Sequence, residues 1–269
     1  MQRMIDQKKY PSGWQVTLSG TGEAIVLLPG FAESSSIWEQ TATWLEKKFR
    51  LILIDYPGNR SHPYNLDCIQ SLEDMAAELH EVLQTVNATS VHLFGHSMGG
   101  YLALAYWELF PQAVSSVGLI HSTAEADDEQ KKKLRSKVME HLKTENPKRI
   151  LSNSIPALFS NPEKYKEVIQ QLIETGCLFR NDALISFYKS MRNRPDRTHL
   201  LRQTTIPVLM VAGKEDKAVA YERLQLQAKL SRKCVLKSLD QVGHMGMFEE
   251  PGILNEILLE FLDSTDQQK

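Results

Sequence analysis

Residues 95–99 constrain the fold of this chain more than any other stretch, because they form a Gly-x-Ser-x-Gly motif centred on Ser97. The motif follows an apolar run at 91–94 and precedes an amphipathic segment that begins at Gly100. A strand, a sharp turn and a helix in direct succession hold the serine in a strained backbone conformation and aim its hydroxyl out of the end of a sheet. Flanking glycines leave room for the neighbouring backbone. We therefore predict a nucleophile elbow with Ser97 as the nucleophile.

A serine hydroxyl needs a base to accept its proton and an acid to orient that base, and two later loops supply both. Asp216 follows an apolar run at 206–213, and His244 follows a predicted strand near 233–238. The order serine, acid, histidine along the chain is one of the orders in which such triads occur. Other carboxylates remain alternatives for the acid on sequence grounds: Glu215, Asp240, Glu125 and Asp127.

Further motifs in the same order carry a resemblance to a known family. They are Leu27-Leu28-Pro29-Gly30-Phe31, Asp55-Tyr56-Pro57-Gly58, the Gly-His-Ser-Met-Gly-Gly elbow, Gly213-Lys214-Glu215-Asp216 and Val242-Gly243-His244. On these motifs the chain resembles the α/β-hydrolases over nearly its full length.

The resemblance implies a role for each matching residue. Ser97 would be the nucleophile, His244 the general base and Asp216 the orienting acid. The backbone N–H groups of Phe31 and Met98 would form the oxyanion hole. Pro29 stands where the family usually has histidine, and although proline lacks an N–H, the expected donor is Phe31.

Alternating apolar and amphipathic runs predict an α/β fold with a mostly parallel sheet of seven or eight strands and helices on both faces. Ser19-Gly20-Thr21-Gly22 reads as a hairpin turn between two strands. An eighth strand would come from residues 3–6 at the edge. Trp38 and Trp44 are expected on the inner face of the first helix. The other strands are expected near 15–19, 24–28, 50–55, 90–95, 116–121, 206–212 and 233–238, and core helices near 36–48, 71–86, 98–110, 221–230 and 251–263.

Strand patterns stop after His121, and residues 123–203 read as charged helices punctuated by prolines. This stretch is too long for a loop in a compact domain. We predict that it is a helical cap inserted between two core strands, with residues 1–122 and 204–269 forming the hydrolase core. Its aromatic residues Phe159, Phe187 and Tyr188, together with Met245 beside His244, are candidates to line an apolar substrate pocket.

Composition and charge limit the kinds of binding partner to expect. A chain of 269 residues with net charge −2 and pI near 6.5 is not expected to bind nucleic acid or an anionic membrane. No apolar run is long enough to span a bilayer, and the start lacks the pattern of a signal peptide. Cys68, Cys177 and Cys234 are far apart, which indicates reduced thiols in a cytoplasmic protein. The histidines show no metal-site spacing, so we expect neither a metal nor an organic cofactor.

Together these features predict a serine hydrolase that cleaves an ester-type bond in a small, mainly apolar substrate through an acyl-enzyme intermediate. Three alternatives use the same fold: a carbon–carbon bond hydrolase, a lyase and a small-molecule receptor. The physiological substrate, the acyl chain length and the oligomeric state do not follow from the sequence.

Overall fold

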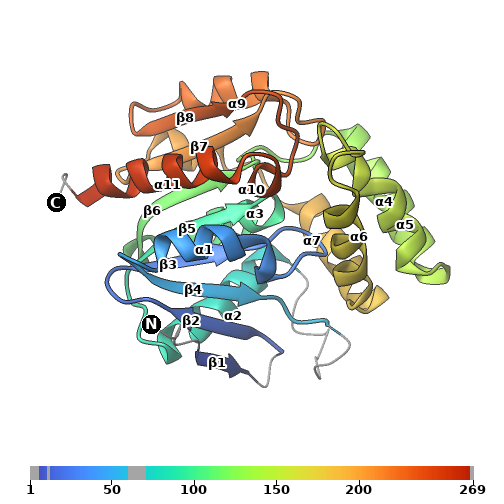
Figure 1. Cartoon of the computed structure of the whole chain (residues 1–269), viewed down its shortest axis with the longest axis horizontal. Helices are drawn as coiled ribbons and strands as arrows, with labels where there is room; N and C mark the ends of the chain where they lie inside the picture. The colour runs from blue at the N-terminus through green and yellow to red at the C-terminus, as the bar shows by residue number, and fades with distance from the viewer. Residues whose placement is uncertain (1–5, 11–12, 60–70, 267–269) are drawn as a thin grey trace.

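An eight-stranded sheet runs through the centre of the molecule in the order β1-β2-β4-β3-β5-β6-β7-β8 (Figure 1). The computed structural model describes residues 6–10, 13–59 and 71–266. At one edge of the sheet, the pairs β1–β2 and β2–β4 are antiparallel, and the other pairs are parallel. This confirms the predicted mostly parallel α/β sheet. The strands are β1 (Asp6–Lys9), β2 (Gln15–Ser19), β3 (Ala24–Leu28), β4 (Arg50–Asp55), β5 (Val91–His96), β6 (Val114–Ile120), β7 (Val208–Gly213) and β8 (Cys234–Leu239).

The central strands are continuous apolar runs, as strands covered on both faces should be. Every residue of β3, β5 and β7 is buried. By contrast, β1 is polar and fully exposed, which suits an edge strand because charged side chains discourage pairing with another molecule. The burial of these four strands therefore matches their hydrophobicity.

The eighth strand expected at this edge is present as Asp6–Lys9, and residues 3–5 of the range expected for it lie outside the described residues. The hairpin expected beside it was wrong. The turn at 19–22 does not close a hairpin, because β4 lies between β2 and β3. Gly20 and Gly22 nevertheless have positive φ values of 70° and 112°, so the turn itself needs glycine. Cys68 also lies outside the described residues.

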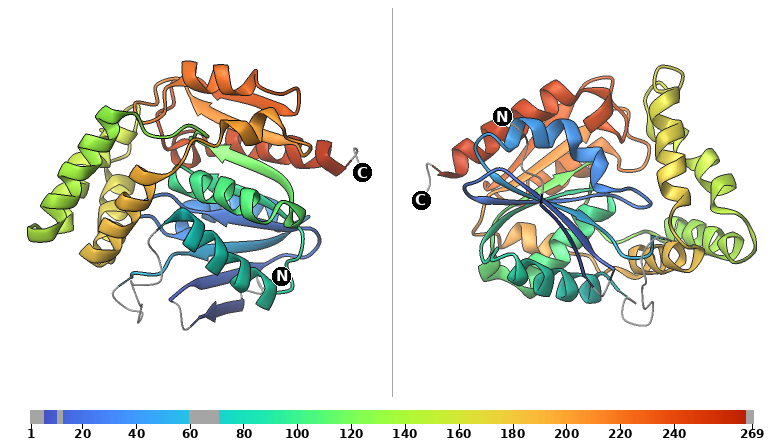
Figure 2. Two further views of the ribbon diagram at one scale, coloured as in Figure 1. Left: turned by 180° about the vertical axis from the view of Figure 1, so that it is seen from behind. Right: turned by 60° about the horizontal axis from the view of Figure 1, so that its bottom comes forward.

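Helices cover both faces of the sheet (Figures 1 and 2). Helices α1 and α11 lie together on one face, and α2 and α3 lie together on the other. Trp38 is fully buried, whereas Trp44 is 41 % exposed, so only the first tryptophan faces inward as expected. The core helices are α1 (Glu39–Leu45), after the 3-10 turn η1 (Ser35–Trp38), α2 (Leu72–Thr85), α3 (Met98–Leu109), α9 (Tyr221–Ala228), α10 (Gly246–Glu249) and α11 (Pro251–Asp266), with the 3-10 turn η3 (Pro111–Ala113) before β6.

The chain between β6 and β7 is helical and lies beside one end of the sheet in both views of Figure 2. We call residues 123–203 the helical segment. None of the described helices is long and apolar enough to cross a membrane. The helices of this segment are α4 (Glu129–Thr144), α5 (Pro147–Ser154), α6 (Lys166–Cys177), α7 (Asn181–Asn193) and α8 (Thr198–Arg202), with the 3-10 turn η4 (Pro156–Leu158).

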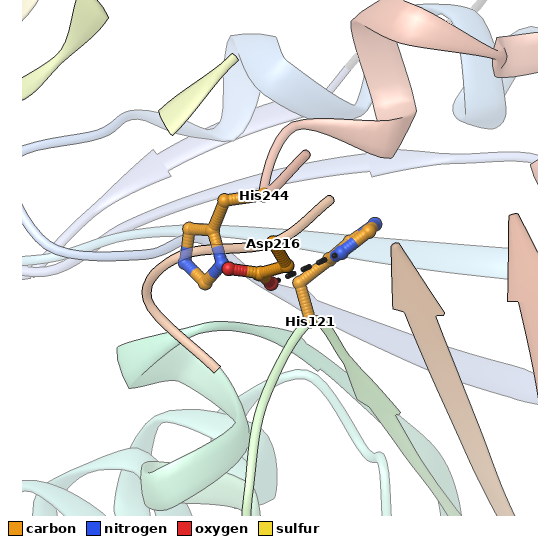
Figure 3. A group of neighbouring side chains, drawn as sticks. All are labelled: His121, Asp216 and His244. Atoms are coloured by element: carbon orange, nitrogen blue, oxygen red, sulfur yellow. Dashed lines mark hydrogen bonds and ion pairs between the residues drawn. The ribbon is translucent and has the colours of Figure 1, made fainter. Parts of the chain in front are cut away.

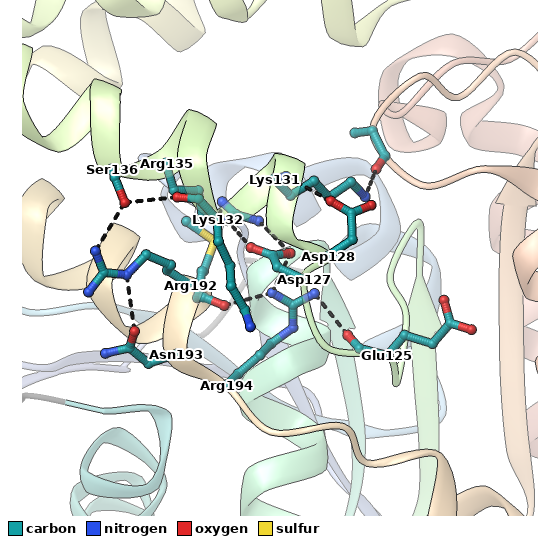
Figure 4. Close-up of polar contacts among 12 residues, drawn as sticks. Glu125, Asp127, Asp128, Lys131, Lys132, Arg135, Ser136, Arg192, Asn193 and Arg194 are labelled. Atoms are coloured by element: carbon teal, nitrogen blue, oxygen red, sulfur yellow. Dashed lines mark hydrogen bonds and ion pairs between the residues drawn. The ribbon is translucent and has the colours of Figure 1, made fainter.

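A buried ionic cluster joins three parts of the helical segment (Figure 4). Asp127, in the loop after β6, pairs with Arg135 of α4 and with Arg194 at the end of α7. The Arg194 guanidinium also lies 3.9 Å from the ring centre of Tyr101 on α3. Burial alone would raise the pKa of Asp127, but its hydrogen bonds and the charges of the two arginines hold it below the usual value.

Candidate active site

Ser97 occupies the turn between β5 and α3 with φ 49° and ψ −113°, an unfavourable conformation for a residue with a side chain. Its N–H donates to the carbonyl oxygen of Ile120 at 3.0 Å, and its own carbonyl accepts from Ser122 Oγ at 2.7 Å. A Cβ on Gly95 would overlap the backbone of Gly99, so the turn admits only glycine there. The strained elbow predicted from the motif is therefore present in the backbone.

Asp216 and His244 come from the loops after β7 and β8 and meet as a hydrogen-bonded pair (Figure 3). His244 Nδ1 lies 2.7 Å from Asp216 Oδ2. The other carboxylate oxygen, Oδ1, accepts the N–H groups of Ala218 and Val219 at 2.8 and 2.9 Å. Burial alone would raise the pKa of Asp216, but His244 and His121 bring it far below its usual value. The carboxylate therefore stays ionised and fixes both the tautomer and the orientation of the His244 ring.

The alternative acids have other partners or face solvent. Glu215 is exposed although it adjoins Asp216. Asp240 pairs with Lys214 at 2.7 Å, and Glu125 pairs with Arg223 at 2.8 Å. Asp127 belongs to the arginine cluster described above. Of the five carboxylates considered from the sequence, the described contacts bring Asp216 to His244.

The loop of His244 contacts the residue that precedes Ser97. His96 Nε2 lies 2.9 Å from the carbonyl oxygen of His244, and the two ring centres are 4.9 Å apart. Among the described contacts, no hydrogen bond joins the Ser97 hydroxyl to the His244 ring. Such bonds are commonly long without substrate and tighten in the complex.

The expected oxyanion donors lie on the two segments that flank Ser97. Met98 is the first residue of α3, where an N–H has no acceptor within the helix. Phe31 lies in the turn after β3, next to Ala32, whose φ of 57° bends the backbone. The preceding N–H, that of Gly30, is held by Glu33 Oε2 at 2.5 Å. This contact fixes the backbone that leads into Phe31.

Sequence reasoning missed His121. It follows β6 directly, and its Nδ1 lies 3.5 Å from Asp216 Oδ2 (Figure 3). Burial lowers the pKa of His121 to about 4, so its ring is neutral. Its position at the carboxyl end of a parallel strand was the available signal, because ligands bind at that edge of such sheets.

His121, Asp216 and His244 are close enough together to be considered as metal ligands. Two ligand atoms of a tetrahedral zinc ion, each about 2.0–2.1 Å from the metal, would lie about 3.3 Å apart. The 2.7 Å separation of His244 Nδ1 and Asp216 Oδ2 is shorter and fits a direct hydrogen bond. The geometry therefore favours an acid–base pair over a metal centre.

Sequence reasoning also missed Glu249, a buried carboxylate on α10. Its Oε1 accepts the N–H groups of Gly243 and Met245 at 2.9 and 3.2 Å, on both sides of His244. Its Oε2 accepts the backbone N–H and the hydroxyl of Ser160 at 2.8 and 2.5 Å. The His244 N–H itself donates to the carbonyl oxygen of Leu158 at 2.6 Å. The helical segment is thus bonded directly to the loop of His244.

The predicted pocket residues lie in different surroundings. The Tyr188 ring packs on Phe31, with 4.3 Å between ring centres. Phe159 and Met245 are buried beside the loop of His244, whereas Phe187 is buried between Tyr56 and Phe179. A cavity of about 350 Å³ lies elsewhere and contains none of these candidates. Its lining includes Thr17, Ser19, Ser35 and Asp55.

Comparisons with known proteins agree with the fold. A family model described as alpha/beta hydrolase fold matches residues 23–251. The chain is 28 % identical over 261 residues to a 2-hydroxy-6-oxononadienedioate/2-hydroxy-6-oxononatrienedioate hydrolase of Burkholderia vietnamiensis, covering 91 % of this chain and 88 % of the relative. It is 23 % identical over 278 residues to the human monoacylglycerol lipase ABHD6, covering 93 % and 79 %.

Among solved structures, a thermophilic esterase from Thermogutta terrifontis superimposes with a TM-score of 0.85 at 24 % identity. The match covers 98 % of this chain and 99 % of the esterase. At this identity the likeness concerns the fold.

Proposed function

Because the chain belongs to the α/β-hydrolase fold family, we propose that it is a serine hydrolase that cleaves an ester-type bond in a small, mainly apolar substrate. The observation that carries the proposal is the hydrogen bond between His244 and Asp216, in loops at the same end of the sheet as Ser97, whose φ is 49°. The relatives in the comparisons are hydrolases, lipases and esterases, which supports the reaction class.

In the proposed reaction Ser97 Oγ attacks the substrate carbonyl while His244 Nε2 takes the serine proton. Asp216 holds His244 in the tautomer that leaves Nε2 free to accept and stabilises the imidazolium that forms. The N–H groups of Phe31 and Met98 bind the oxyanion, and each such donor contributes about 3 kcal/mol to the transition state. His244 then protonates the leaving group, and a water activated by His244 hydrolyses the acyl-enzyme.

The surroundings of Phe31 support an apolar acyl group. Tyr188 covers Phe31, and the side chains of Phe159 and Met245 bury apolar surface beside the His244 loop. We propose that residues 123–203 act as a cap that selects the substrate, with the bond-breaking groups supplied by the core. In that arrangement changes in the cap alter which ester fits more than how the ester is cleaved.

A carbon–carbon bond hydrolase is the second candidate. The 28 % identical relative from Burkholderia vietnamiensis carries a name of that kind, and such enzymes use the same fold. A substrate panel separates the candidates: a dienoic ketone acid that is cleaved between carbons, against p-nitrophenyl esters from acetate to palmitate. Preference for the ketone acid by several orders of magnitude in kcat/KM would favour the second candidate.

The nucleophile is tested with a fluorophosphonate probe and mass spectrometry. The wild-type protein should be labelled on Ser97 and should hydrolyse the esters. Ser97→Ala should lose both while keeping its circular dichroism spectrum. Ser115→Ala is a matched control, because the Ser115 hydroxyl lies 2.7 Å from Ser90 Oγ, near the start of β6 and away from the elbow. Labelling that persists in Ser97→Ala would refute the proposal.

A further inference from the structure

Two buried residues that the proposed mechanism does not use contact each other beneath the site. Glu33 Oε2, which accepts the Gly30 N–H at 2.5 Å, also lies 2.9 Å from His96 Nδ1. The other ring nitrogen of His96, Nε2, lies 2.9 Å from the carbonyl oxygen of His244. His96 is fully buried and Glu33 is 6 % exposed. The His96 ring therefore has an oxygen acceptor at each nitrogen.

This arrangement decides the protonation of His96. A neutral imidazole has one N–H donor and one lone pair, so it would turn the lone pair towards one of these oxygens. A doubly protonated ring donates to both. An unpaired buried polar atom costs about 1–3 kcal/mol, which favours the doubly protonated form. Burial alone would lower the pKa of His96, but the Glu33 charge, its hydrogen bond and the His244 carbonyl leave it raised.

The contacts join the segments that must be aligned for catalysis. Gly30 precedes the oxyanion donor Phe31, His96 precedes Ser97, and the third partner is the backbone of His244. We propose that Glu33 and His96 form a buried ion pair that positions the oxyanion loop and the His244 loop relative to Ser97, with His96 positively charged in the active enzyme. The inference rests on the proposed roles of Ser97, Phe31 and His244.

The other titratable groups around His96 are compatible with its charge. The rings of His244 and His121 lie 4.9 and 6.1 Å away between centres, and His121 is neutral because burial lowers its pKa to about 4. The Asp216 carboxylate adds a favourable negative charge, as Glu33 does. The positive charge of His96 thus faces two carboxylates.

A raised folded-state pKa sets the direction of the pH dependence. The stability from the ion pair is complete below about pH 6.5, the ordinary value for histidine, and is lost as the pH rises through the higher pKa of His96 in the folded state. Alignment of the site should be lost over the same range, so kcat should fall on the alkaline side.

Nitrogen-15 NMR of histidine-labelled protein tests the charge without relying on activity. At pH 7 the His96 ring should show a proton on each nitrogen, assigned from the signals that move in Glu33→Gln. A His96 ring that carries one proton at pH 7 would overturn the proposal.

Kinetics of Glu33→Gln test the positioning role. The amide oxygen can still accept from Gly30, but the charge is gone. We expect kcat to fall at least tenfold, KM to change less than threefold and the alkaline fall in kcat to move to lower pH. A kcat and alkaline profile like those of the wild type would overturn the proposal.

Glu23→Gln is the matched control. Glu23 pairs at 3.2 Å with Nε2 of His92, another buried histidine of β5 that lies near the opposite end of the strand from Ser97. This variant should keep the wild-type kcat and pH profile, and an equal loss in both variants would refute a specific positioning role. Failure of the fluorophosphonate to label Ser97 would instead refute the proposed hydrolase, while the NMR result would still decide the charge of His96.

Discussion

Replacement of Asp216 by asparagine should convert the site into one with the wrong histidine tautomer. Oδ1 of Asp216 accepts two backbone N–H groups, from Ala218 and Val219, while Oδ2 faces His244 Nδ1 at 2.7 Å. The single oxygen of the new amide is therefore held by the two backbone donors, and its NH₂ group faces His244. That ring must then accept at Nδ1 and carry its proton on Nε2, so it cannot take the proton of Ser97.

The expected loss of kcat is large because His244 is still present but can no longer act as a base. The equivalent tautomer change in a serine protease lowers kcat about 10⁴-fold, which corresponds to about 5.5 kcal/mol in the activation barrier. We expect a loss of this order in kcat for p-nitrophenyl acetate. The backbone bonds of the loop are kept, so the unfolding transition in urea should change little.

Glu215→Gln is the control, because Glu215 is adjacent in sequence but exposed. Its kcat should stay within about twofold of the wild type. Retention of more than a tenth of the wild-type kcat by Asp216→Asn, or a larger loss in Glu215→Gln, would refute the assignment of the acid.

Three further predictions concern the helical segment and the thiols. Asp127→Ala leaves Arg135 and the buried Arg194 without their shared carboxylate. The free energy of unfolding, measured in urea, should therefore fall by about 3–5 kcal/mol, and a fall of less than about 1 kcal/mol would contradict a stabilising role of the cluster. Tyr188→Ala should change the relative kcat/KM values for esters of different chain length by about tenfold to a hundredfold, while the turnover of p-nitrophenyl acetate is kept. An unchanged chain-length preference would place the acyl pocket elsewhere. Burial raises the pKa of Cys234 to about 11, so at pH 8 roughly one molecule in a thousand carries the thiolate. A disulfide reagent should therefore modify the partly exposed Cys177 before Cys234, as followed by mass spectrometry, and equal rates at the two thiols would be inconsistent with this burial.

The strands could be predicted because burial on both faces leaves a local signature. The apolar runs that became β3, β5 and β7 contain no polar residue at a core-facing position other than the histidines of β5. The order of strands in the sheet has no such signature, so the turn at 19–22 was read as a hairpin although β4 separates its two strands. Trp44 shows a limit for helices: at 3.6 residues per turn it lies about 120° around the helix axis from Trp38, and it turns towards solvent near Lys47.

Some residues of the candidate site could also be predicted from the sequence, and others could not. Ser97, Asp216 and His244 stand in short motifs, so each could be nominated from its immediate neighbours. Glu33 could not, because its meaning depends on His96, which is 63 positions away, and His96 in turn on His244, 148 positions further. A glutamate in a loop reads as a solvated charge until the fold shows which N–H groups surround it.

Buried carboxylates on two sides fix the main chain of the proposed base. Its carbonyl accepts from His96, which Glu33 holds, and its N–H donates to Leu158 while Glu249 binds the residues before and after it. Glu249 also binds Ser160, so the same carboxylate holds the helical segment and the loop of His244. A shift of residues 158–160 on substrate entry would therefore move the His244 backbone as well. Changes near Ser160 should for this reason alter kcat, whereas changes at Tyr188, which contacts Phe31 through its side chain, should act mainly on the choice of substrate.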